Sequence, residues 1–168
     1  MTMPVFSGST VKNEISPAEL NQRVAVIKRF KELLKAQRDR FRAYLDSLDK
    51  QAEVIQGGTV DDLAHYVELE EKIVTDIFSI QKVIDPLEEM YHSVRHGVPV
   101  SEGDEVSGLK DALEGLKAEA VIRSERNREL LSERMVSLRS EIKSLRNNPY
   151  ARRLRVTTAA PAHIDIKG

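Results

Sequence analysis

Residues 16–58, SPAELNQRVAVIKRFKELLKAQRDRFRAYLDSLDKQAEVIQGG, decide the fold, because apolar side chains recur in them every seven residues. This spacing is sustained over five heptads and predicts one long helix in a coiled-coil-like contact. The first seam is Leu20, Ile27, Leu34, Phe41, Leu48 and Ile55, and its companion is Val24, Lys31, Arg38, Leu45 and Ala52.

Capping signals mark both ends of this helix, which we expect over residues 16–56. Ser16-Pro17-Ala18-Glu19 has the pattern of a capping box with proline at the first helical position. At the other end, Gly57-Gly58 favours a left-handed C-cap, which glycine adopts without strain.

A second helix is expected over residues 59–96, capped by Thr59. Pro86 lies inside its apolar pattern and predicts a kink rather than an end, and Glu70 interrupts one seam. The short glycine turn predicts an antiparallel hairpin with the first helix. Opposite charges favour the same pairing, because the second helix is acidic and residues 28–42 of the first are basic.

A third helix is expected over residues 108–147, after an exposed loop at 97–108 that is rich in helix breakers. Its heptad slips at the polar stretch 123–128, which reads as a stutter. Residues 1–15 and 148–168 are expected to be flexible termini. The predicted fold is all-α: an elongated antiparallel bundle of three long helices, a coiled-coil-like hairpin plus the third helix.

The composition narrows the functional classes. Cysteine is absent, which removes disulfides, thiolate catalysis and cysteine metal sites. The net charge of −1 gives no global attraction to nucleic acids or membranes. No apolar run approaches the ~20 residues needed to span a bilayer, and the first residues do not resemble a secretory signal. We therefore expect no membrane insertion and a cytoplasmic location.

Catalytic and metal-binding patterns are weak. His92 and His96 stand four residues apart, as two ligands on a helix would, but further ligands are not evident and two solvated histidines are the favoured interpretation. No phosphate loop, nucleophile elbow or zinc-protease motif occurs. Aromatics suited to stacking on bases are scarce, and Glu32 and Asp39 dilute the first of the two basic patches, at 28–42 and 152–155. We expect no enzyme activity, no metal, no cofactor and no nucleic-acid partner.

The better signal is for protein binding by the last part of the third helix. Its apolar face suits a helix docked in a groove, and the methionine in it adds an adaptable contact. The same face would also suit the core of the bundle, and the stripe alone does not separate the two interpretations. The candidate cargo-binding residues are Leu130, Leu131, Met135, Leu138, Ile142 and Leu145.

Three stretches resemble the FlgN type of flagellar export chaperone. They are residues 127–131, NRELL, and the second-helix residues 71–73, EKI, and 80–88, IQKVIDPLE. The likeness covers roughly residues 18–150, while the 97–108 loop and the IDIKG ending depart from the family pattern.

The resemblance implies a function. Proteins of this family are cytoplasmic chaperones that bind the helical terminal segments of hook-associated proteins and deliver them to the flagellar type III export gate. It places cargo binding on the C-terminal part of the third helix, and Tyr150 is a candidate for docking to the gate. The alternative is a structural coiled-coil scaffold that acts by self-association, as a homo-dimer.

Overall fold

The computed structural model describes residues 15–97 and 99–147. They form three long helices: α1 over Pro17–Gly57, α2 over Val60–Val94 and α3 over Val100–Asn147. The described residues contain no strand, so the predicted all-α class is confirmed. None of the three helices is both long enough and apolar enough to cross a membrane. The predicted flexible termini lie outside the described residues.

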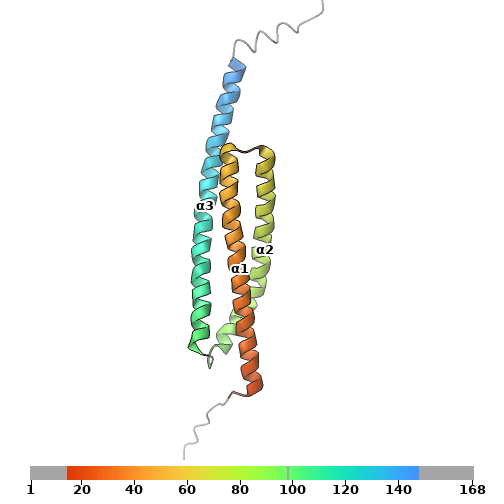
Figure 1. Ribbon diagram of the computed structural model, residues 1–168, viewed down its shortest axis with the longest axis vertical. Helices are drawn as coiled ribbons and strands as arrows, with labels where there is room; N and C mark the ends of the chain where they lie inside the picture. Colours follow the sequence, from red (N-terminus) through yellow and green to blue (C-terminus); the bar gives the residue numbers. More distant parts are fainter. Residues whose placement is uncertain (1–14, 98, 148–168) are drawn as a thin grey trace, which may run out of the picture.

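α1 is the central helix of the bundle. It packs against both α2 and α3. α2 runs antiparallel to it, as the short turn predicts, whereas α3 runs in the same direction as α1 and continues past the α1–α2 turn (Figure 1). α2 itself continues through Pro86 to Val94.

The helix caps follow the sequence signals at Ser16 and Thr59. The Ser16 hydroxyl accepts a hydrogen bond from the Glu19 amide at 3.2 Å. Thr59 and Asp62 form a reciprocal capping box, and hydrogen bonds from Thr59 lower the pKa of the Asp62 carboxyl. Both contacts satisfy amides that the first helical turn leaves unpaired.

The left-handed C-cap predicted at the glycine pair is wrong. Gly58 is extended, with φ −92° and ψ −176°. Glycine is needed for space instead, because a Cβ atom at Gly58 would lie 2.7 Å from the Cγ1 atom of Val54 and 3.0 Å from that residue's backbone. The close approach lets the Gly58 amide donate to the Val54 carbonyl at 2.7 Å.

The main core joins all three helices near the start of α1. Phe30 is fully buried, and its ring centroid lies 5.1 Å from that of Tyr91 in α2. Such aromatic contacts add to the free energy gained by burying apolar area. The buried cluster is Ile27, Phe30, Leu33 and Leu34 of α1, Ile84 and Tyr91 of α2, and Val106, Leu109 and Leu113 of α3.

The exposed loop predicted over residues 97–108 is wrong for most of its length, because α3 already begins at Val100. Val106 is only 2% exposed and belongs to the core. Burial of such a side chain contributes about 1.5–3 kcal/mol, which offsets the cost of about 1 kcal/mol for a glycine inside a helix. Gly103 and Gly108 are therefore accommodated within α3.

The charge pairing also differs from the prediction. In the described part of the chain, one ion pair joins α1 to α2, Arg40 with Asp76 at 3.4 Å. The basic part of α1 instead pairs with the first turns of α3. Lys31 lies 2.5 Å from a Glu102 oxygen and 2.7 Å from a Glu105 oxygen. These contacts raise the pKa of Lys31, and the hydrogen bonds from Lys31 and Lys35 lower that of Glu105 to about 2.

The two α1 seams are not buried along their whole length. Leu20 and Val24 are 40% and 50% exposed, whereas Ile27, Leu34 and Leu48 are almost fully buried. Because α1 lies between two helices, it buries a further set that the seams do not include: Phe30, Leu33, Gln37 and Ser47.

Candidate partner-binding surface

A set of polar contacts joins α3 to α1 near the turn between α1 and α2. Asn127 is 4% exposed, and its Nδ2 atom donates to the Leu48 carbonyl at 2.8 Å and to Gln51 Oε1 at 2.9 Å. Two arginines reach the same part of α1: Arg123 and Arg126 lie 2.8 Å and 3.1 Å from Asp49 oxygens. We call Asp49, Gln51, Arg123, Arg126 and Asn127 the polar clamp.

The clamp extends to α2 through Glu70, the residue that interrupts the second-helix seam. Gln51 Nε2 donates to Glu70 Oε2 at 2.9 Å, and the Tyr44 hydroxyl donates to Glu70 Oε1 at 3.1 Å. Burial, together with the Glu70 charge and hydrogen bond, raises the pKa of Tyr44 to about 12. All three helices therefore meet in one polar layer, and Glu70 has partners inside the bundle.

The sequence predicts the polar stretch 123–128 as a stutter that separates a packed first part of the third helix from a second part that is available for binding. It does not predict that this stretch attaches α3 to α1. A signal was present, because Asn127 follows Ala120 by seven residues and so falls on the same seam as Leu113 and Ala120. An asparagine on an apolar seam is a common way to fix register.

Beyond the clamp lies the last part of α3, residues 128–147, which we call the arm. The end of the arm continues past the end of α1. α1 ends at Gly57, nine residues after Leu48, whereas α3 continues for twenty residues after Asn127. At about 1.5 Å per residue, the arm extends about 16 Å past the end of α1. In Figure 1 the blue end of α3 projects past the turn between α1 and α2.

The arm carries an exposed apolar strip. It consists of five of the six predicted cargo-binding residues: Leu131, Met135, Leu138, Ile142 and Leu145, which are 39%, 47%, 40%, 57% and 64% exposed. Leu130, the sixth, is partly buried. Tyr150 lies outside the described residues.

Exposure separates the two interpretations of this face that the sequence leaves open. Leu109 and Leu113, on the first part of α3, are 8% and 3% exposed and lie in the core. The strip is not part of that core. Within the described residues, the apolar face of α3 thus divides at Asn127 into a packed part and an open part.

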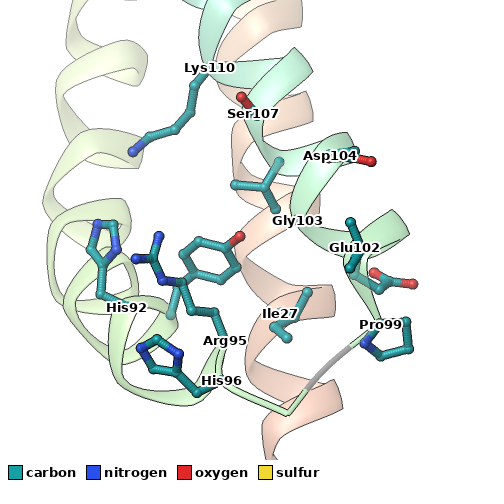
Figure 2. A pocket seen from close by; sticks show the side chains of 13 residues that line it. Ile27, His92, Arg95, His96, Pro99, Glu102, Gly103, Asp104, Ser107 and Lys110 are labelled. Carbon is teal, nitrogen blue, oxygen red and sulfur yellow. The ribbon is translucent and has the colours of Figure 1, made fainter.

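A depression lies at the opposite end of the bundle, between the end of α2 and the start of α3. His92 comes from the last turn of α2, Arg95 and His96 directly follow that helix, and Lys110 reaches across from α3 (Figure 2). Lys110 forms an ion pair with Glu88, and His92 Nε2 lies 3.9 Å from the same carboxylate. No group of three or more potential metal-ligating side chains occurs among residues 15–97 and 99–147.

Comparisons with known proteins were made by family model, by solved structure and by sequence. No protein-family model matches the chain, and no solved structure matches it. An uncharacterized protein of Treponema pallidum (strain Nichols) is 31% identical over 132 residues, which cover 79% of this chain and 82% of that protein. Identity at this level over most of both chains shows common descent, and the chain belongs to the same family as this Treponema pallidum protein.

Proposed function

We propose that the chain is a non-enzymatic, cytoplasmic chaperone that holds an amphipathic helical segment of another protein on the apolar strip of α3. One observation carries this proposal: five large apolar side chains stand 39–64% exposed on a helical arm that extends past the rest of the bundle. A contiguous exposed apolar surface of this kind is typical of an interaction site. Its helical spacing suits a partner helix.

The resemblance to FlgN-type chaperones supplies the candidate cargo. By that resemblance, the partner is the C-terminal helical segment of a hook-associated protein, which the chaperone delivers to the flagellar type III export gate. The NRELL stretch at 127–131 lies where the clamp ends and the arm begins. This position supports the proposed cargo, because the NRELL stretch, which resembles the chaperone family, directly adjoins the exposed apolar strip.

The strip is suited to reversible binding. A fully buried apolar side chain contributes about 1.5–3 kcal/mol, and roughly half of that remains to be gained at five half-exposed positions, or about 4–8 kcal/mol in total. The apolar face of the partner is buried in the same contact and contributes a similar amount. The entropic cost of association, about 4 kcal/mol or more, is subtracted from this sum. A chaperone that must release its cargo needs such modest affinity.

The test compares two double variants of the full chain. Leu138→Glu with Ile142→Glu places two charges on the strip. Val136→Glu with Ser140→Glu places two charges on the opposite face of the arm, with the same spacing. Calorimetric titration with the C-terminal segment of a hook-associated protein should give 1:1 binding for the wild type and the second variant, and no binding for the first.

Circular dichroism serves as the control for folding, since all four positions are exposed and the helical content should stay unchanged. Loss of helical structure in the strip variant would mean that these residues belong to the folded core. Equal cargo binding by both variants would place the cargo elsewhere.

A structural scaffold is the second candidate, and the heptad spacing of the strip favours it. Leu131, Met135, Leu138, Ile142 and Leu145 alternate in steps of four and three, as a coiled-coil seam does. A scaffold would self-associate through this seam without cargo. Sedimentation equilibrium at several concentrations distinguishes the two, because a free monomer that becomes 1:1 with cargo contradicts the scaffold.

A further inference from the structure

The apolar strip is bordered mainly by arginines. Arg134 precedes Met135 along one edge, and Arg139 and Arg146 follow Leu138 and Leu145 along the other. In heptad terms these are the positions that face the flanks of a docked helix. All three arginines are exposed.

The acidic side chains of the arm are mostly placed away from the strip. At about 100° per residue, Glu129 and Glu133 fall on the opposite face. Glu141 is the acidic residue beside the strip, and it accepts a hydrogen bond from Ser137 at 3.2 Å. The border of the strip is therefore positively charged, although the chain as a whole has a net charge of −1.

No ion pair between described residues involves Arg134, Arg139 or Arg146. The ion pairs of α3 use residues nearer its start, such as Glu102, Lys110 and Arg123. The three guanidinium groups thus remain available to a partner. A helix docked on the strip would carry its own flanking side chains within reach of them.

We infer that the strip selects an amphipathic helix whose apolar seam is flanked by acidic side chains. This inference rests on the proposed function and adds the charge of the partner to it. Exposed charge pairs contribute little each, but like charges brought together disfavour the wrong partner. The arginines therefore act on the choice of partner, and the leucines and isoleucine supply the buried area.

A second copy of this chain matches these charges less well than an acidic partner does. In a parallel pair, Arg134 of one copy faces Arg139 of the other, while Glu141 faces Arg146. In an antiparallel pair, Arg139 and Arg146 meet on one edge, while Arg134 and Glu141 meet on the other. Either orientation therefore brings two arginines together, whereas a partner with acidic residues on both flanks pairs all three arginines. A nucleic acid would neutralise the arginines but leave the apolar strip in water.

Two synthetic peptides of about 20 residues test this inference with the full chain. They share one apolar heptad seam and differ only at the flanking positions, which are all glutamate in one and all lysine in the other. Fluorescence titration at about 0.05 M salt should show about tenfold tighter binding of the glutamate peptide, or about 1.4 kcal/mol. The ratio should shrink at about 0.5 M salt, because the charges are exposed.

Two triple variants show which residues cause the preference for the glutamate peptide. Replacing Arg134, Arg139 and Arg146 by glutamine removes three positive charges beside the strip and should abolish this preference. The matched control, Val136→Glu with Ser140→Glu and Ser144→Glu, changes the net charge by the same amount on the far face and should retain most of the preference for the glutamate peptide.

The possible results separate the inference from the proposed function. Equal binding of both peptides, abolished by Leu138→Glu with Ile142→Glu, would overturn the charge inference and leave helix binding by the strip intact. If neither peptide binds, both fail. Dimerisation of the free chain through the strip at micromolar concentration would also overturn the inference, since the arginines would then not prevent self-pairing.

Discussion

Replacing Asn127 by alanine should lower the free energy of unfolding by about 1–3 kcal/mol. The side chain is 4% exposed and donates two hydrogen bonds, at 2.8 Å to the Leu48 carbonyl and at 2.9 Å to Gln51. Each such bond contributes about 0.5–1.5 kcal/mol net. The Leu48 carbonyl keeps its place in the α1 helical ladder, so the loss is not increased by an orphaned backbone group.

Urea denaturation followed by circular dichroism measures this difference. Asn147→Ala is the matched control: it makes the same chemical change on the same helix at an exposed position, and it should alter the free energy of unfolding by less than about 0.5 kcal/mol. An Asn127→Ala protein as stable as the control would refute the contribution of Asn127 to the attachment of α3 to α1. The contacts of Arg123 and Arg126 with Asp49 and the core around Phe30 would then hold the helix.

Two further predictions concern the contacts between α1 and the start of α3. Val106→Ala should lower the free energy of unfolding by about 1.6 kcal/mol or more, because it removes two buried methyl groups at about 0.8 kcal/mol each. Val100→Ala, at a position 80% exposed, should leave the free energy of unfolding nearly unchanged. Equal effects of the two substitutions in urea denaturation would favour an exposed loop over residues 97–108. Because the folded-state pKa of Glu105 is lowered to about 2, its ion pair with Lys31 stabilises the fold above pH 4.5, and this stabilisation is lost as the pH falls from 4.5 through 2. The difference in melting temperature between the wild type and Lys31→Gln should narrow over that range, and a constant difference would argue against the ion pair.

The heptad spacing was sufficient to predict three long helices and the hairpin, because one periodic stripe per helix fixes which residues must be buried. Ile27, Leu34, Leu48 and Ile55 are buried as the first seam requires. Ser16 and Thr59 cap helices as their side chains suggest.

The start of α3 could not be located from local preferences. Gly103, Gly108 and the acidic residues between them resemble a loop when read alone. They become helical because Val106 reaches the core and Glu102 and Glu105 meet Lys31 of α1. These are tertiary contacts between residues about seventy positions apart, and a local sequence pattern does not predict them.

The candidate surface was predictable in its residues but not in its exposure. A stripe such as Leu131, Leu138 and Ile142 has the same spacing whether its neighbour is a helix of the same chain or of another protein. Exposure depends on where α1 ends relative to α3. The contacts of Asn127 with Leu48 and Gln51 are among the tertiary contacts that fix this offset.

Amide hydrogen exchange on the arm tests the central claim most directly. In the free protein, residues 131–145 should exchange faster than residues 109–120, because their apolar side chains are largely exposed and the last part of the arm lies past the end of α1. Adding the C-terminal segment of a hook-associated protein should slow exchange in residues 131–145 and leave the region around Phe30 and Tyr91 unchanged. Slow exchange of the arm in the free protein, or protection that appears only elsewhere, would contradict a partner-binding strip on α3.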